Sequence, residues 1–190
     1  MRLTDDRYSR DWRRMELAVR MIGHEARTGT IRQWTGLSDD RIRKLYRTYL
    51  ESAPATTPVR RHRGKTPTQT GYFLRNRELR RHAALLAGIY TRLGLLDLDA
   101  VTGLPVRRGP PLAWAPLALT AYEAYLDLCP AVRISFEHAS QLLNALWIAT
   151  ELDLAPCCRC SALMLVDRLR RSASPCTFCE TPAPGGSADG

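Results

Sequence analysis

Five of the six cysteines lie near the C-terminal end of the sequence, where two C-x2-C pairs are separated by fifteen residues. A tight turn lets two thiolates of such a pair reach one metal ion, and zinc is the metal that most often takes four of them. Four thiolates complete the tetrahedron and leave no open position for a substrate. The spacing therefore predicts one structural zinc ion per chain, with these ligands: Cys157, Cys160, Cys176 and Cys179.

Other roles for the cysteines stay open from the sequence. Cys158 could replace Cys157 as a ligand in a C-x-C arrangement, but the two-residue spacing is commoner, so we interpret Cys158 as a spare thiol. Cys129 precedes a proline and is interpreted as a small buried apolar residue. Disulfides need an oxidising compartment, and the first residues carry no apolar signal segment, so we expect reduced thiols and a cytoplasmic location. A redox C-x2-C is expected near a βαβ pattern, and none is visible.

Helical periodicity dominates the sequence that must position these cysteines. Apolar residues recur at spacings of three and four over 11–27, 72–96, 117–128 and 136–152, and such spacing predicts helices. We expect six or so helices and no convincing strand before the cysteines. The predicted fold class is mainly α, with a helical N-terminal and central region and a C-terminal four-cysteine zinc-binding module. The first of these segments has this predicted core face: Trp12, Met15, Val19, Ile22 and Ala26.

A helix-turn-helix-like segment is predicted from Thr30 to Tyr46, with its first helix over Ile31 to Thr35. A short helix ends at Thr35, Gly36 supplies the turn, and Ser38 caps a second helix. In DNA-binding versions of this motif, basic side chains at the start of the second helix reach base edges and phosphates. Any two packed helices joined by glycine give the same pattern, so an ordinary helical corner is the alternative. The predicted inward residues are Ile31, Leu37, Ile42 and Leu45. The predicted DNA contacts here are Arg32, Arg41, Arg43 and Lys44.

Positive charge is concentrated in the N-terminal part of the chain. Residues 1–82 hold twenty Lys/Arg and nine Asp/Glu, whereas residues 83–190 hold eight and ten. This asymmetry is typical of a surface that binds a polyanion, most often nucleic acid. A proline- and glycine-rich basic linker over 52–70 is predicted to track phosphates, with a solvated linker as the alternative. Further predicted DNA contacts, in this linker and at the start of the following helix, are Arg60, Arg61, Arg63, Lys65, Arg75, Arg77, Arg80 and Arg81.

The sequence suggests five consecutive parts. These are a helical region with the helix-turn-helix-like segment at 1–51, the basic linker at 52–70, a second helical region at 71–154, the zinc-binding module at 155–180 and a disordered tail at 181–190. No apolar run is long enough to cross a membrane. The four histidines are scattered, and no P-loop or dinucleotide motif occurs, so we expect no enzyme activity.

Several stretches resemble the FlhC family, a subunit of the bacterial flagellar master transcriptional regulator. They are Glu-Leu-Ala-Val at 16–19 through Gly-Leu-Ser at 36–38, Arg-Lys-Leu-Tyr at 43–46, Ala-Tyr-Glu-Ala-Tyr-Leu-Asp-Leu-Cys-Pro at 121–130, and the cysteine cluster. The resemblance implies a mostly helical activator subunit that forms a hetero-oligomer with FlhD. It also implies binding to double-stranded DNA upstream of flagellar (class 2) operons and recruitment of RNA polymerase.

Two other functions fit the same residues. One is a paralogous regulator of non-flagellar genes, and the other is a zinc-stabilised module that binds protein partners. An RNA-binding zinc protein is a third alternative, but the aromatic residues lie at helical core spacings and form no evident stacking platform.

Overall fold

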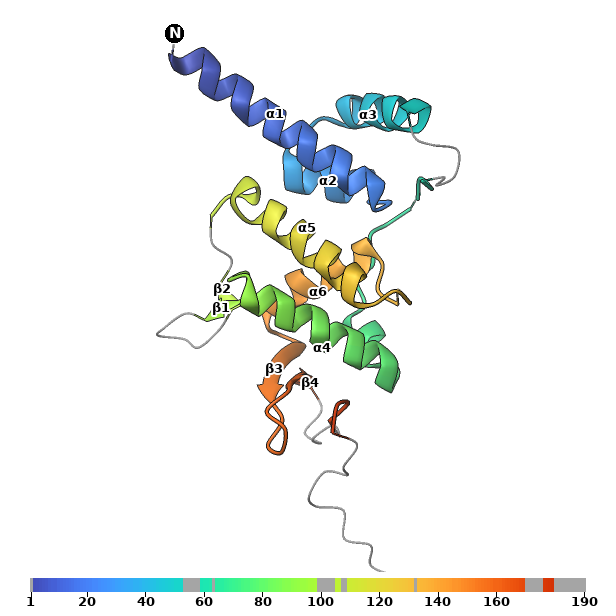
Figure 1. The fold of residues 1–190 in the computed structure, drawn as a ribbon, viewed down its shortest axis with the longest axis vertical. Helices are drawn as coiled ribbons and strands as arrows, with labels where there is room; N and C mark the ends of the chain where they lie inside the picture. The colour runs from blue at the N-terminus through green and yellow to red at the C-terminus, as the bar shows by residue number, and fades with distance from the viewer. Residues whose placement is uncertain are drawn as a thin grey trace, which may run out of the picture. The chain divides into compact units, whose positions relative to one another are not determined.

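The computed structural model describes residues 2–52, 59–62, 64–98, 105–106, 109–131, 133–169 and 176–179. Within these residues the chain is mainly helical, with six α-helices and four short strands (Figure 1). The predicted fold class is therefore confirmed, including a cysteine cluster near the C-terminus. None of the helices in this described part combines the length and apolar character that a membrane span requires.

The chain divides into two compact units. The first unit comprises the described residues of Met1–Pro67 and Arg108–Thr120, and the second those of Thr68–Arg107 and Ala121–Gly190. Helix α5 (Pro111–Leu128) supplies its first part to the first unit and its last part to the second. The five-part division expected along the sequence stays a prediction. Its tail at 181–190 lies outside the described residues.

Three helices of the first unit pack against one another: α1 (Arg2–Gly23), α2 (Thr28–Thr35) and α3 (Asp39–Ser52) (Figure 1). Their core is aliphatic and aromatic, and Trp34 meets Trp114 of α5 edge to face with ring centroids 5.0 Å apart. Removing these side chains from water is the main source of the stability of this unit. From α1, the buried apolar side chains are Leu17, Ala18, Met21 and Ile22.

The N-terminal part of α1 differs from the prediction. The helix begins at Arg2 and ends at Gly23, and Trp12, which the sequence placed on the core face, is 59% exposed. Tyr8, one turn earlier, is 75% exposed. The prediction of a core role for Trp12 was wrong because a helical period identifies one face of a helix but not how far along it the core extends.

The helix-turn-helix-like segment forms as predicted. Gly36 ends α2 in the left-handed conformation with φ +70°, where its N–H donates to Arg32 O at 2.8 Å. Glycine adopts this conformation without a steric penalty from Cβ. Ser38 Oγ accepts the N–H of Arg41 at 3.4 Å and caps α3. The predicted inward residues are buried or half-buried: Ile31, Leu37, Ile42 and Leu45.

Buried tyrosines tie the helices of the second unit together. This unit contains the short 3-10 helix η1 (Thr70–Leu74), α4 (Arg77–Arg92), the end of α5 and α6 (Phe136–Ile148). The hydroxyl of Tyr90 donates to Ala139 O at 3.0 Å, and that of Tyr122 donates to Ile134 O at 3.2 Å. Because a buried hydroxyl without a partner is costly, these bonds favour one arrangement of the helices.

Two predicted helices have different limits in the structure. The single helix expected from Tyr72 is interrupted, because Asn76 accepts the N–H of Leu79 at 2.8 Å and caps a new helix, α4. Helix α5 begins at Pro111, six residues before its predicted start, and runs through Pro116. Proline suits the first position of a helix, and inside one it removes a single backbone hydrogen bond. The apolar spacing therefore placed the start of this helix too late in the sequence.

Two antiparallel hairpins correct the expectation of no strand before the cysteines. β1 (Asp97–Leu98) pairs with β2 (Pro105–Val106), and β3 (Leu152–Pro156) pairs with β4 (Leu163–Asp167). The helix expected to reach Leu152 ends at Ile148, where Ala149 turns the chain with φ +51°. A strand of five residues is too short to be told from a buried helix by its apolar pattern.

Candidate metal centre

The first cysteine pair lies in the turn that joins β3 to β4. Pro156 and Leu163 are the last paired residues of this hairpin. The N–H of Cys157 donates to Ala162 O, and the N–H of Ser161 donates to Cys157 O, both at 2.9 Å. These bonds close the turn, so the β-hairpin fixes the position of the first pair.

The second pair forms a turn of the same kind. In each turn the sulfur of the first cysteine accepts the N–H of the residue two positions later. Arg159 N–H donates to Cys157 Sγ at 3.5 Å, and Phe178 N–H donates to Cys176 Sγ at 3.4 Å. Such N–H groups stabilise a thiolate, which is the form that binds metal. The two turns therefore present matched sulfur ligands.

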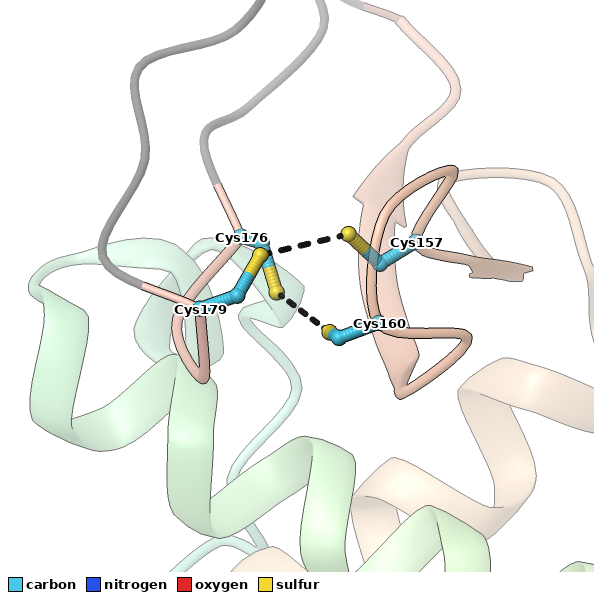
Figure 2. Close-up of side chains that lie close together, drawn as sticks. All are labelled: Cys157, Cys160, Cys176 and Cys179. Atoms are coloured by element: carbon cyan, nitrogen blue, oxygen red, sulfur yellow. Dashed lines mark hydrogen bonds between the residues drawn. The ribbon is translucent and has the colours of Figure 1, made fainter.

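The four sulfur atoms converge across the two turns, as Figure 2 shows. Cys157 Sγ lies 3.6 Å from Cys179 Sγ, and Cys160 Sγ lies 3.7 Å from Cys176 Sγ. All four lie within 4.8 Å of one another. A tetrahedral ion with zinc–sulfur bonds of about 2.3 Å needs sulfur atoms about 3.8 Å apart, whereas a disulfide needs about 2.05 Å. The arrangement therefore fits a metal ion held by four thiolates.

The position of Cys158 bears on the choice left open by the sequence. Its side chain is exposed and it is not a member of the converging group, whereas Cys157 is buried and belongs to it. The C-x2-C interpretation therefore describes the geometry. Cys129 is half-buried and lies at the end of α5, outside the cluster.

The electrostatics of the turns favour a thiolate at the first cysteine of each pair, whereas the pKa of Cys160 lies above its ordinary value, because the N–H of Ala162 is outweighed by burial and by hydrogen bonds with Cys157 and Cys176. The N–H of Cys160, followed by that of Arg159, lowers the pKa of Cys157 to about 6 against the opposing effect of burial. The N–H of Cys179 is the largest cause that lowers the pKa of Cys176 below its ordinary value. Because metal binding requires deprotonated sulfur, the backbone N–H groups favour binding at Cys157 and Cys176.

Contacts with α4 support both turns. Strand β4 packs against α4, and Leu165 of this strand is buried. The guanidinium of Arg81 lies 5.9 Å from the ring centroid of Phe178, which belongs to the second turn. Arg168, just after β4, donates to Ala149 O at 2.9 Å. The candidate metal centre is thus joined to the helices of the second unit.

The predicted DNA contacts on α2 and α3 include three arginines that each lie beside a carboxylate of the same unit. Three ion pairs have N–O distances of 3.3, 2.7 and 2.6 Å, respectively. They involve exposed or half-buried groups, so solvent screens them strongly. Lys44 is exposed on α3. The pairs, in the order of these distances, are Arg32 with Asp39, Arg41 with Asp11, and Arg43 with Asp40.

The remaining predicted contacts fall in two groups. In the first unit, Arg60, Arg61 and Lys65 are exposed, and Arg63 lies outside the described residues. In the second unit, Arg80 donates to Leu74 O from Nε at 3.1 Å and from Nη2 at 3.0 Å, which gives it a structural role. Arg75 lies 5.5 Å from the ring centroid of Tyr72. The other two, Arg77 and Arg81, are exposed at the start of α4.

Sequence reasoning missed the acidic partners of these basic residues. Asp40 and Arg43 are three residues apart on one helix, a spacing from which the pair could have been predicted. Asp11 and Arg41 are thirty residues apart and meet only because α1 packs against α3. No local signal in the sequence identifies the second pair.

Comparisons with known proteins add no identification. A scan against protein-family models found no match, and a search among curated proteins found none. The resemblance to the FlhC family therefore stays a prediction from the sequence.

Proposed function

We propose that the four cysteines bind one zinc ion per chain and that this ion is structural. The proposal is supported by the sulfur spacing and by the four-thiolate donor set, which suits zinc and excludes hard cations that prefer oxygen. An ion held by four protein ligands has no open position, so no reaction is assigned to it and the chain is proposed not to be an enzyme. Elemental analysis of the purified chain tests the identity of the metal. One zinc per chain supports the proposal, and one iron per chain overturns it.

The chain as a whole is proposed to be the DNA-binding subunit of a transcriptional activator in the cytoplasm. The observation that carries this is the α2–Gly36–α3 segment, which has exposed basic residues on α3 and basic linker residues in the same unit. In proteins with this motif the second helix enters the major groove and nearby Arg and Lys bind phosphates. The alternative of a helical corner predicts no DNA binding.

The partners of this activator are proposed from the family resemblance. They are FlhD in a hetero-oligomer, double-stranded DNA upstream of flagellar (class 2) operons, and RNA polymerase. A paralogous role at non-flagellar genes uses the same surfaces with another operator. Co-expression with FlhD followed by co-purification tests the first partner.

A zinc-stabilised protein-interaction module is the second candidate function. Two observations favour it: the carboxylates that pair with arginines of α3 and offset their positive charge, and the exposed aromatic residues Tyr8 and Trp12 of α1. Aromatic residues are enriched at protein interfaces. Affinity for a protein partner depends weakly on salt when the interface is apolar. Affinity for DNA falls steeply as the salt concentration rises, because each phosphate contact releases counterions.

A salt series separates the two candidate functions. The affinity of the metal-loaded chain for a short mixed-sequence duplex is measured from about 50 to about 200 mM salt. A linear fall of log affinity with log salt supports DNA binding. No measurable duplex binding at low salt, alone or with FlhD, overturns it in favour of the interaction module.

A further inference from the structure

Glu25 has an unusual backbone conformation at the junction of α1 and α2. Its φ is +59°, in the left-handed region that residues other than glycine rarely adopt. Such conformations persist where the surrounding structure holds them, and they concentrate at functional positions. The contacts of the Glu25 side chain show which interactions this conformation makes possible.

Both carboxylate oxygens of Glu25 bind the basic linker. Oε1 accepts the backbone N–H of Arg60 at 3.0 Å, and Oε2 lies 2.7 Å from Nε2 of His62. Burial raises the pKa of Glu25, but the Arg60 N–H and His62 outweigh it, so the pKa lies below its ordinary value and the group is ionised at neutral pH. Glu25 thus binds the backbone of Arg60 and the ring of His62, and the Arg60 side chain is exposed.

Arg61 holds the linker on the same unit through two further contacts, and Gly64 lies near Arg27. The guanidinium of Arg61 donates to Thr28 Oγ1 at 3.5 Å and lies 5.2 Å from the ring centroid of Tyr46 on α3. A Cβ at Gly64, where φ is +99°, would lie 3.3 Å from Arg27 Nη1. Arg61 of the linker therefore contacts the start of α2 and also α3.

The charge balance of this linker differs from that of α3. No Asp or Glu occurs in the sequence between Glu51 and Glu78, whereas Arg41 and Arg43 of α3 each pair with a carboxylate. The exposed basic residues Arg60, Arg61 and Lys65 therefore have no acidic neighbour within their own segment, and Glu25 is a carboxylate from outside it whose charge acts on Arg60.

We propose that Glu25 is a positioning residue that docks residues 60–62, 64 and 65 on the first unit as a phosphate-binding arm beside α3. This inference rests on the proposed binding of duplex DNA. Docking restricts the arm before DNA arrives, so less conformational entropy is lost on binding. The arm contacts the sugar-phosphate backbone and fixes the position of α3, and it carries no sequence information of its own.

The test compares Glu25→Ala with Glu16→Ala. The two variants have the same composition and net charge, and Glu16 is an exposed residue of α1. If only net charge matters, both variants bind DNA equally and slightly more tightly than the parent, because each lacks one negative charge. If Glu25 positions the arm, Glu25→Ala binds more weakly.

Two readouts are measured on the full-length metal-loaded chain, with FlhD where the parent requires it. The first is amide hydrogen exchange at Arg60, which we expect to be slow in the parent and in Glu16→Ala and fast in Glu25→Ala. The second is duplex affinity across a salt series. We expect the affinity of Glu25→Ala to be about fivefold weaker or more. For this variant, the slope of log affinity against log salt should become less steep by about 0.9 for each phosphate that the arm no longer neutralises.

The outcomes separate this inference from the proposed function. If the parent binds DNA and Glu25→Ala matches Glu16→Ala in affinity and slope, the positioning role is wrong and DNA binding stands. If the parent binds no DNA, both are wrong, even if exchange shows the arm docked. Should Glu25→Ala fail to fold, His62→Ala removes one of the two contacts of Glu25 from the arm side, and it must show a decrease in exchange protection and in the steepness of the salt slope that is in the same direction but smaller.

Discussion

The cysteine centre of the second unit and the basic surface of the first unit differ in how strongly their residues specify a function. Four thiolates within 4.8 Å of one another have few stable arrangements other than a metal site or disulfides. The arginines of α2 and α3 also lie where the sequence predicts, yet three of them pair with carboxylates. Ligand type and spacing thus define chemistry locally, whereas the effect of a charge depends on partners brought by the fold.

The free energies expected at the two regions also differ, and the cysteine centre has the larger one. Zinc binding contributes about 10 to 16 kcal/mol in zinc-finger peptides, and this is folding energy when the site is absent from the unfolded chain. Exposed ion pairs are screened by solvent and salt. We therefore expect the largest effects at the cysteines and the smallest at the ion pairs.

The largest expected effect is at the ligands. Cys160→Ser or Cys176→Ser replaces one of four thiolates, so we expect loss of the metal, disorder of both turns and loss of DNA binding by the complex. Metal content after dialysis against a chelator measures the first, and hydrogen exchange in β4 the second. Cys158→Ser is the matched control and should keep one metal ion per chain. A serine variant at Cys160 that keeps its full metal content would contradict the four-ligand site.

An intermediate effect is expected from the core of the first unit. Ile42 is fully buried on α3, and Ile42→Ala leaves a cavity that typically costs about 2 to 5 kcal/mol of stability. Thermal unfolding should show a lower midpoint. DNA affinity should fall, and metal content below the midpoint should equal that of the parent. If the metal were released as well, the contrast between the two units would be invalid.

The smallest effect is expected at Asp11. Its hydrogen bond to Arg41 lowers the pKa of the carboxyl below its ordinary value of 3.8. Because the folded-state pKa is depressed, the pair stabilises the fold above the ordinary pKa, and this contribution disappears as the pH falls through the lower, folded-state value. An NMR titration of Asp11 should show a midpoint below 3.8, which returns to the ordinary range in Arg41→Gln. An unchanged midpoint in Arg41→Gln would show that the pair does not form in solution.

Local patterns account for what the sequence could predict. The cysteine set, the turn at Gly36 and the buried positions Ile31 and Ile42 follow from spacing within a few residues, and the structure contains each of them. The residues at which α4 and α5 begin were harder to predict. They depend on a cap at Asn76 and on prolines that helices tolerate near their start.

Contacts between segments that are far apart in the chain account for the features that the sequence could not predict. The exposure of Trp12 depends on where the core of the first unit ends along α1. The β3–β4 hairpin has strands too short for a decisive pattern. Glu25 binds a segment thirty-five residues later, and only the folded backbone brings the two together.

The central claim is that this chain is a metal-stabilised DNA-binding protein, and the salt dependence of duplex affinity tests it most directly. The full-length chain, co-expressed with FlhD and holding one zinc, is titrated with duplex DNA at increasing salt. We predict that log affinity falls linearly with log salt, with a slope that decreases when arm residues Arg60 and Arg61 are replaced by Gln. Zinc-loaded protein with no duplex affinity at low salt, or with an affinity that salt does not change, would contradict this claim.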